Sequence, residues 1–220
     1  MLNRFELLIN FLGGLVVFLI GFIALKRSRG DKLPSGSIKL EKSNSTNHHQ
    51  VPGNRWSHLG VTLPIILNSI LEIFVIFLCI FNTWDSTFQI IAIDFPRWLN
   101  WIGIAGLWLC IPWDLMNFYY NANFTRLYKP LKGEYVLATG GPYKYIRHPM
   151  YVGGAIEVFS FLLATGIWFT IIYFIIFIIA LPYQASGEEK LLRELFGSIY
   201  DEYASRTGRF FPKLKIFNPK

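Results

Sequence analysis

The residues best suited to chemistry lie in one run, from Thr139 to Tyr151, which is rich in glycine and tyrosine and includes Arg147 and His148. Pro149 follows directly, and proline suits the first turn of a helix while it keeps the preceding residue out of helical geometry. The sequence therefore predicts that a helix begins at Pro149. Unpaired N–H groups at such a helix start, beside Arg147 and His148, attract a carboxylate or a phosphate. The same residues also suit a basic flank with interfacial tyrosines beside a membrane span.

Two adjacent glutamates, Glu188 and Glu189, supply the opposite charge farther along the chain. Ser186 precedes Glu189 at the spacing of a capping box, which predicts that a helix begins at Ser186. Apolar residues then recur at helical spacing from Leu191 to Tyr203, which indicates an amphipathic helix on the membrane surface or across the site. Carboxylates in a first helical turn also complement the helix dipole, so a purely structural role for the glutamates stays open.

The elements that must position these residues are membrane helices. The chain has 220 residues, 53% of them hydrophobic, which is too apolar for an ordinary soluble domain. We expect an all-α integral membrane protein of about five transmembrane helices, the last two forming a hairpin that turns near Gly166. The predicted spans are Phe5–Leu25, Val61–Phe81, Trp98–Phe118, Pro149–Ile167 and Trp168–Pro182. A short loop is expected after the second span, and a polar C-terminal tail after the fifth.

The basic residues predict which ends of these helices face the cytoplasm. Of 21 Lys and Arg residues, only Arg4 and Arg97 lie outside the polar stretches 26–56, 119–149 and 183–220. Basic residues concentrate on the cytoplasmic side, so we expect an external N-terminus and a cytoplasmic C-terminus, in a plasma membrane or an endoplasmic reticulum. The net charge of +7 then reflects membrane topology, and we expect neither nucleic acid nor an obligate protein partner. The linker 30–56 is expected to be flexible.

Three acidic residues fall well inside the predicted spans, away from their first residues: Glu72, Asp114 and Glu157. Carboxylates within a membrane are functional candidates, although these also suit a solvated interface or a structural hydrogen bond. Glu157 has the strongest case because it shares a predicted helix with Pro149. The two cysteines of the chain lie in apolar segments and match no metal spacing, so no metal site is expected.

Three motifs follow one another in the second half of the chain. They are Gly141-Pro-Tyr143-x-Tyr145-x-Arg147-His-Pro-x-Tyr151, Glu188-Glu-x-x-Leu192 and Phe196-Gly-x-x-Tyr200-x-x-Tyr203. Their order and spacing resemble the isoprenylcysteine carboxyl methyltransferase and phospholipid methyltransferase superfamily, over roughly residues 130–213. The stretch from Thr207 to Pro212 is similar to the end of prokaryotic members.

This resemblance implies a site for S-adenosylmethionine (S-adenosyl-L-methionine) on the cytoplasmic side, capped by the C-terminal helix, with a lipophilic methyl acceptor entering sideways from the bilayer. It divides the chain into N-terminal spans, 1–120, and a catalytic region, 121–220. The residues implied to bind the cofactor are Tyr135, Val136, Leu137, Ala138, Tyr143, His148, Pro149, Met150, Tyr151 and Glu188, the last of which would take its ammonium. The catalytic candidates are Glu188, Glu189, Arg147 and Glu157.

The sequence departs from the superfamily at two places. Prenylcysteine enzymes carry an arginine four residues before the ammonium-binding glutamate, and this chain has Gln184 there. A neutral amide does not form the bidentate ion pair of an arginine with a substrate carboxylate, although Arg193, Arg206 or Arg209 would be substitutes. In addition, the loop 121–132 lacks the usual Gly-x-x-Trp pattern. The acceptor is left open among a prenylcysteine, a phospholipid amine, a small thiol and an isoprenoid-like lipid.

A membrane sterol- or steroid-type reductase that binds NADPH is the main alternative, because those enzymes also carry an Arg-His-Pro-x-Tyr run. Their run usually reads Arg-His-Pro-Asn-Tyr, whereas this chain has Met150 at the variable position. Met150 and the pair Glu188–Glu189 therefore favour the methyltransferase. A catalytically inactive relative is a further alternative, and no inverted repeat indicates a transporter.

Overall fold

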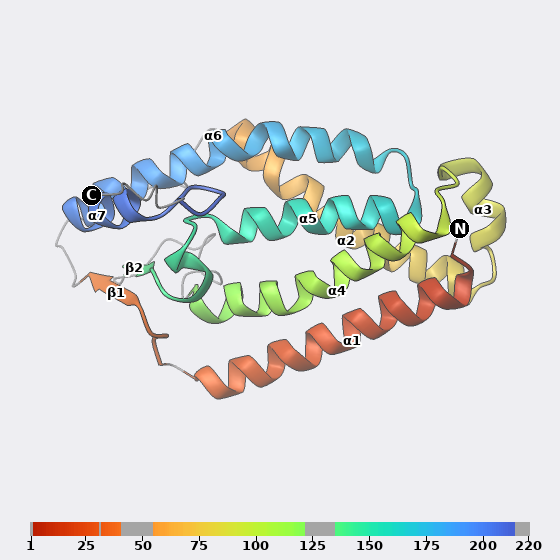
Figure 1. Ribbon diagram of the computed structural model, residues 1–220, viewed down its shortest axis with the longest axis horizontal. Coiled ribbons are helices and arrows are strands. Elements are labelled where there is room, and N and C mark those ends of the chain that lie inside the picture. The colour runs from red at the N-terminus through yellow and green to blue at the C-terminus, as the bar shows by residue number, and fades with distance from the viewer. Residues whose placement is uncertain (1, 31, 41–54, 122–134, 214–220) are drawn as a thin grey trace, which may run out of the picture.

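The computed structural model describes residues 2–30, 32–40, 55–121 and 135–213, which form a long bundle of helices with a small sheet at one end (Figure 1). Four helices are long and apolar enough to cross a membrane: α1 (Arg4–Arg29), α2 (Arg55–Ile80), α4 (Arg97–Tyr120) and α6 (Thr170–Phe196). A shorter apolar helix, α5 (Pro149–Thr165), lies among them. The predicted all-α integral membrane fold is confirmed.

One end of the bundle, called the sheet end below, carries the elements that surround the predicted site (Figure 1). They are β1 (Ser37–Leu40), β2 (Tyr135–Ala138), the short 3-10 helix η2 (Gly141–Lys144) and α7 (Ser198–Arg206). The strands pair antiparallel, with Ser37 opposite Ala138 and Leu40 opposite Tyr135. Residues 37–40 of the predicted flexible linker therefore form a strand, its last two residues begin α2, and 41–54 lie outside the described residues.

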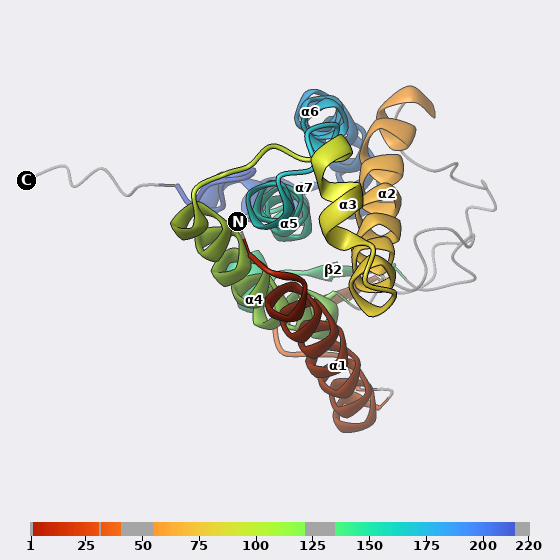
Figure 2. The same ribbon diagram turned by 90° about the vertical axis from the view of Figure 1, so that its right-hand side faces the viewer.

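The other end of the bundle, called the α3 end below, holds the largest apolar core. The connection between α2 and α4 at this end, which was predicted to be a loop, contains the helix α3 (Trp84–Ile91). Leu7 and Phe11 of α1 pack here with Val75 of α2 and Phe161 of α5, and the rings of Phe11 and Phe161 meet edge to face. Figure 2 shows that α1 and α2 lie close together at this end and diverge toward the far end.

The hairpin of α5 and α6 turns where the sequence predicts. Gly166 caps the C-terminus of α5 with a φ of 71°, a left-handed conformation that glycine adopts without a steric penalty. α4 packs directly on the backbone of α5, because a Cβ on Gly103 would lie 2.3 Å from the amide nitrogen of Ala164. This close contact fixes α5, and with it the start of α5 at Pro149, relative to α4.

The predicted helix start at Ser186 is wrong. α6 continues through Pro182 and Ser186 to Phe196, and the Ser186 hydroxyl donates to the Pro182 carbonyl at 2.7 Å. A capping box requires free backbone N–H groups, and the preceding helical turn already accepts them here. The break falls instead at Gly197, with a φ of 54°, and divides the predicted amphipathic helix between α6 and α7.

Candidate functional site

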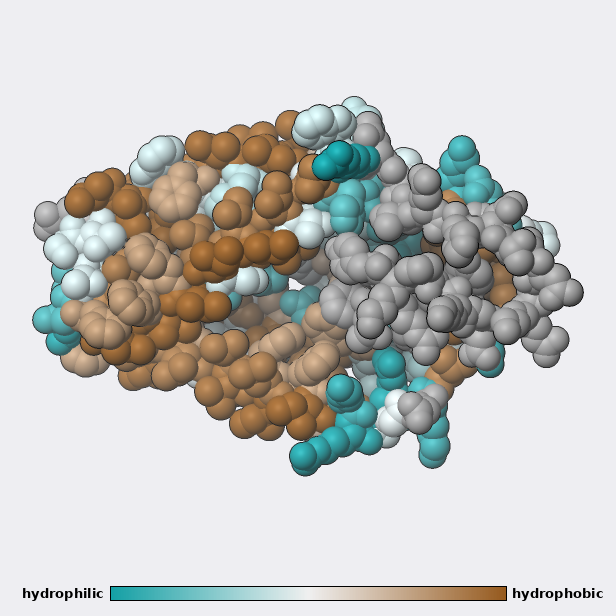
Figure 3. Space-filling view, turned by 180° about the vertical axis from the view of Figure 1, so that it is seen from behind, coloured by the Kyte–Doolittle hydropathy of each residue, from teal (hydrophilic) through white to brown (hydrophobic). Residues whose placement is uncertain are grey.

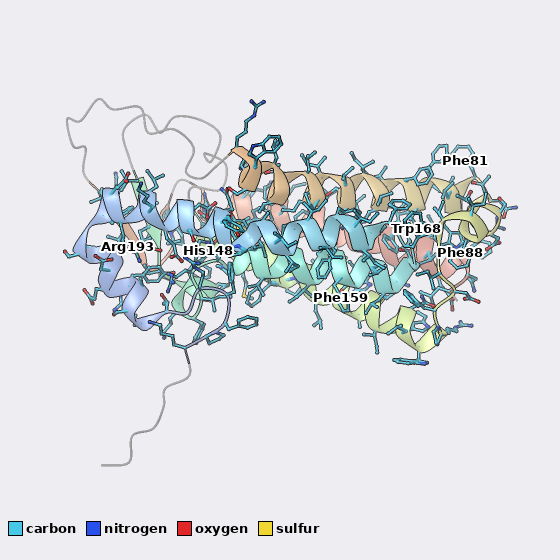
Figure 4. All side chains as sticks on the ribbon, turned by 90° about the horizontal axis from the view of Figure 1, so that it is seen from above. Phe81, Phe88, His148, Phe159, Trp168 and Arg193 are labelled. Carbon is cyan, nitrogen blue, oxygen red and sulfur yellow. The ribbon has the colours of Figure 1, made fainter. Side chains whose placement is uncertain are left out.

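The centre of the candidate site is the imidazole of His148, which lies between the two adjacent glutamates. His148 is the N-cap of α5, and both glutamates lie on α6, so the hairpin brings them together. Nδ1 of His148 lies 3.4 Å from Glu188, and Nε2 lies 3.2 Å from Glu189. Figure 4 shows His148 beside α6, with Arg193 farther toward the sheet end.

The surroundings of His148 favour its charged form. Burial lowers the pKa of His148, but the hydrogen bonds to Glu188 and Glu189 raise it more, and the net pKa lies above the usual value. Because each ring nitrogen faces a carboxylate, both nitrogens are donors, as in an imidazolium. The site therefore pairs one buried cation with two carboxylates.

Glu189 is surrounded by cations. Arg147 Nε donates to Oε1 at 3.0 Å, and Arg209 makes a two-pronged contact through Nε at 3.0 Å and Nη2 at 2.7 Å. With His148, three basic side chains surround a residue that is 3% exposed. A carboxylate held in this way stays ionised, so its contacts suit a structural tie better than proton exchange with a substrate.

The segment 207–209 completes the cluster from the C-terminal side. Its backbone accepts from the N–H groups of Arg147 (Gly208 carbonyl, 2.8 Å) and His148 (Arg209 carbonyl, 3.1 Å). The guanidinium of Arg147 also donates to the Thr207 carbonyl at 2.6 Å. The backbone N–H groups of Arg147 and His148, directly before the helix start that was predicted to attract an anion, are thus occupied by the chain itself.

Glu188 differs from Glu189 because its side chain is 22% exposed. It accepts hydrogen bonds from the hydroxyl of Tyr151 and from Nε2 of Gln184, the latter at 3.2 Å. Gln184 in turn accepts from the Ser57 hydroxyl of α2 at 3.1 Å. The amide at the departure from the superfamily pattern therefore links α2 to Glu188 and is itself 3% exposed.

Aromatic side chains lie beside His148 and near the Glu188 carboxylate. The ring of Tyr151 stacks on His148 with an interplanar angle of 8° and a centroid distance of 5.5 Å. Phe210, after the segment 207–209, lies 5.8 Å from His148 by ring centroids. Tyrosine and phenylalanine faces beside a carboxylate suit an organic cation.

The η2 segment and β2 connect the site to the rest of the sheet end. Tyr143 is buried, its carbonyl accepts from the Tyr203 hydroxyl of α7 at 2.7 Å, and its own hydroxyl accepts from Asn121 of α4 at 3.0 Å. Asn121 also approaches the sulfur of Met150 at 3.7 Å. Residues of the first and third motifs thus meet around Tyr143.

The remaining residues predicted to bind the cofactor lie in β2. Val136, Leu137 and Ala138 are buried in β2, where Leu137 packs against Tyr200 and Tyr203 of α7. For Tyr135 the structure describes the backbone alone, as the strand residue opposite Leu40. The loop 121–132, which lacks the Gly-x-x-Trp pattern, lies outside the described residues except for Asn121.

Glu157 is not part of the cluster. It follows His148 by nine residues on α5, which corresponds to about 13 Å along a helix. Glu157 instead faces Asn68 of α2, whose amide donates to Glu72 at 2.9 Å and accepts from Tyr173 at 3.2 Å. The structure therefore separates two groups of carboxyls, one at the sheet end and one inside the bundle.

Sequence reasoning missed two polar residues near the site. Ser57 gives no sequence signal, because a lone serine at the start of a span is common. Asn117 of α4 is 0% exposed, and its side chain interacts with the carboxyl of Asp114. An asparagine inside an apolar span was a signal that could have been used.

The comparisons with known proteins agree with this geometry. Residues 98–199 match the family model described as phospholipid methyltransferase, part of the isoprenylcysteine carboxyl methyltransferase-like membrane methyltransferase superfamily. The nickel-cobalt-cadmium resistance protein NccN of Alcaligenes xylosoxydans xylosoxydans is 34% identical over 82 residues, 37% of this chain. The aligned part spans 38% of that protein's length. The matched residues 98–199 include the first two predicted motifs, so the comparisons support the predicted resemblance to this superfamily over that part of the chain.

Proposed function

We propose that the chain is an integral membrane methyltransferase that takes its methyl group from S-adenosylmethionine and transfers it to a lipophilic acceptor. The observation that carries the proposal is the meeting of His148, Tyr151 and Glu188 inside the family-matched region. The family match supports a membrane methyltransferase that acts on lipids, and it does not favour the reductase alternative.

The residues at the sheet end fit the chemistry of this cofactor. Its methionyl ammonium requires a carboxylate that a ligand can reach, and Glu188 is partly exposed whereas Glu189 is enclosed by Arg147, His148 and Arg209. Its sulfonium suits aromatic faces, which Tyr151 supplies. We therefore assign Glu188 and Tyr151 to the cofactor and Glu189 to the positioning of His148.

When bound, the cofactor supplies an electrophilic methyl group on a sulfonium, and transfer of that group is a displacement in which positioning accounts for most of the catalysis. The protein's contribution is to hold the reacting groups. The cations around Glu189 fix the start of α5, and the link from Ser57 through Gln184 fixes Glu188.

The orientation is part of the proposal. The basic stretches flank the sheet end, so the site faces the cytoplasm of a plasma membrane or endoplasmic reticulum, and the lipid bilayer surrounds the four long helices. Gln184 replaces the arginine that holds a substrate carboxylate in prenylcysteine enzymes, and its amide is already engaged by Ser57 and Glu188. We infer that this enzyme's acceptor is not a prenylcysteine carboxylate.

Calorimetric titration of the detergent-purified protein with S-adenosylhomocysteine tests the proposal. We expect binding by the wild type and loss of binding, by tenfold or more, in Glu188→Gln and His148→Ala, since each change removes a charge at the centre of the site. Glu202→Gln on the exposed face of α7 is the matched control and is expected to bind normally.

Two results would count against this assignment. Normal binding of S-adenosylhomocysteine by both variants would remove Glu188 and His148 from the cofactor site. Binding of NADPH in its place by the wild type would support the reductase alternative instead.

A further inference from the structure

The connection between α1 and α2 lies against the segment that leads to the candidate site, although it is outside the family-matched residues 98–199. Its described part includes β1 and a turn formed by residues 34–37, called the linker turn below. The Ser37 N–H donates to the Pro34 carbonyl at 3.2 Å across this turn, and Gly36 has a φ of 79°. A turn with a positive φ at its third residue favours glycine there, so the sequence suits the turn locally.

The linker turn holds the loop 139–141, which follows β2. The carbonyl of Gly36 accepts hydrogen bonds from the N–H of Thr139 at 2.9 Å and from the Thr139 hydroxyl at 2.6 Å. Beside these bonds, a Cβ on Gly36 would lie 2.7 Å from the amide nitrogen of Gly140, closer than real Cβ atoms approach. Glycine is therefore required at this position both by the φ of the turn and by the contact with the loop.

The two glycines of the loop lie between the linker turn and the end of α4. A Cβ on Gly140 would lie 2.1 Å from the carbonyl oxygen of Ser35. A Cβ on Gly141 would lie 2.2 Å from the ring of Tyr120. The space that side chains would fill at these two positions is thus occupied by the linker turn on one side and by α4 on the other.

β1 anchors the linker turn to the C-terminal helices. Ile38 and Leu40 are two residues apart and therefore lie on the same side of the strand. Both pack against a cluster of buried side chains from β2, α6 and α7 (Leu137, Phe196, Tyr200 and Tyr203). This packing fixes where the linker turn meets the loop, because β1 follows the turn directly.

The loop 139–141 begins the segment that carries His148. Gly141 is the first residue of η2, and η2 ends four residues before His148. The segment 207–209 fixes the far end of this stretch, because its carbonyls accept from the two backbone N–H groups directly before α5. The linker turn fixes the near end, so a displacement of the loop changes the position of Tyr143 and of the backbone that leads to His148.

The linker turn belongs to the polar end of the molecule. In Figure 3 most of the hydrophilic residues in view gather at the sheet end, while hydrophobic residues cover most of the rest of this face. Ser35 and Gly36 are exposed, so the turn lies between the solvent and the loop. A substitution in the turn therefore acts on the loop and leaves the apolar core at the α3 end unchanged.

We propose that the linker turn is part of the cofactor site, where it holds the loop 139–141 and, through η2, keeps Tyr143 and His148 in the arrangement that binds the cofactor. This inference deepens the proposed function and rests on it. Gly36 and Thr139 are the positioning residues, and they act through the backbone of the loop without touching the cofactor. The site then includes an element that the family-matched region does not contain.

Two glycine variants of the full, detergent-purified chain test this role by calorimetry with S-adenosylhomocysteine, at a temperature where each variant is folded. Gly36→Ala forces a Cβ against Gly140, and we expect it to weaken the binding about tenfold. Gly30→Ala is the matched control. Gly30 also has a positive φ, 52°, but a Cβ there would meet no atom of the described residues within 4 Å. This variant also strains the backbone and should bind normally.

Thr139 supplies a second pair of variants if Gly36→Ala does not fold. Thr139→Val removes the hydroxyl bond to the Gly36 carbonyl at nearly the same volume, and it should weaken the binding severalfold. Thr139→Ser keeps the donor and should bind like the wild type. A merely structural role would lower the Tm of Thr139→Val and leave the affinity of the folded protein unchanged. That result, or normal affinity of folded Gly36→Ala, would overturn the proposal.

Hydrogen exchange of the ligand-free protein separates this inference from the proposed function. Gly36→Ala and Thr139→Val should speed amide exchange over residues 135–147, because both disturb the bonds between the linker turn and the loop, whereas Gly30→Ala should not. Unchanged exchange would contradict the positioning role even if the affinity fell. Absence of S-adenosylhomocysteine binding in the wild type would contradict the proposed function, and the exchange would still decide whether the linker turn holds the loop.

Discussion

At the scale of single residues, the carboxylates of Glu188 and Glu189 have different surroundings, although the two residues are adjacent in the sequence. Glu189 is enclosed by Arg147, His148 and Arg209, while Glu188 keeps an exposed edge and neutral partners besides His148. One glutamate therefore stabilises the fold at the start of α5, and the other is open to a ligand. A change at either position should have a different consequence, although the two residues are neighbours in the sequence.

The charge of His148 makes stability depend on pH. Its folded pKa lies above the unfolded value of about 6.5, because the bonds to Glu188 and Glu189 outweigh the effect of burial. The stabilisation is thus fully present below the unfolded pKa and is lost as the pH rises through the folded pKa. We expect the difference in Tm between the wild type and His148→Gln to be largest at acidic pH and to shrink as the pH increases.

Thermal unfolding of both detergent-solubilised proteins over a pH series measures this difference. All other ionisable groups are present in both proteins, so the pH dependence of the difference in Tm reports the titration of His148. A difference in Tm that is constant with pH would show that His148 does not change its charge in this range.

The sequence predicted the members of this cluster but not how their contacts are shared. The resemblance of the stretches around Arg147-His148-Pro149 and Glu188-Glu189 to the superfamily motifs implied that a basic and an acidic group share one site. It gave no information on which glutamate faces the arginines, because that depends on the rotation of α6 about its axis. The link through Ser57 comes from α2, outside the motifs, and short-range patterns do not reach it.

At the scale of elements, the contact of α4 with α5 holds the site in place. The hairpin, the helix start at Pro149 and the long apolar spans were predictable because apolar length, proline and glycine are local signals. The continuation of α6 past Ser186 was not, because a capping pattern is local whereas the preceding helical turn decides whether its N–H groups are free. The two-strand sheet also escaped prediction, since it joins segments far apart in the chain.

Two glycines test the contact between α4 and its neighbours. A Cβ on Gly103 would lie 2.3 Å and 2.5 Å from backbone atoms of α5, so Gly103→Ala must push the helices apart and should destabilise the protein by about 1–3 kcal/mol. A Cβ on Gly13 would lie 3.7 Å from Trp108, an ordinary contact, so Gly13→Ala should be neutral or slightly stabilising through its higher helix propensity.

Thermal unfolding in detergent, together with the S-adenosylhomocysteine titration, compares these two variants. Equal stability of Gly103→Ala and Gly13→Ala would mean that α4 and α5 are not packed backbone to backbone in the membrane.

At the scale of the whole molecule, the distribution of charge orients the bundle in its membrane. Among the described residues, the basic stretches lie at the sheet end with the site, and Arg4 and Arg97 are the only Lys or Arg residues at the α3 end. The positive-inside rule then predicts that the site faces the cytoplasm. The division into spans 1–120 and a catalytic region 121–220 remains a prediction.

Cysteine labelling tests this orientation. In a protein with Cys79 and Cys110 replaced by serine, Asn82→Cys at the α3 end should react with a membrane-impermeant maleimide on intact cells. Lys144→Cys at the sheet end should react only after the cells are permeabilised, because the membrane shields the cytoplasmic side. The reverse pattern would invert the topology and contradict a cytoplasmic site.

The position of the segment 207–209 has a consequence for the synthesis of the protein. Its carbonyls pair with the start of α5, and Arg209 completes the cations around Glu189, yet it follows all four long apolar helices that the structure describes. A ribosome that has delivered these four helices to the membrane has therefore still not supplied the residues that close the site. The nascent chain assembles its membrane helices first, and the candidate site is complete only when this last segment has been translated.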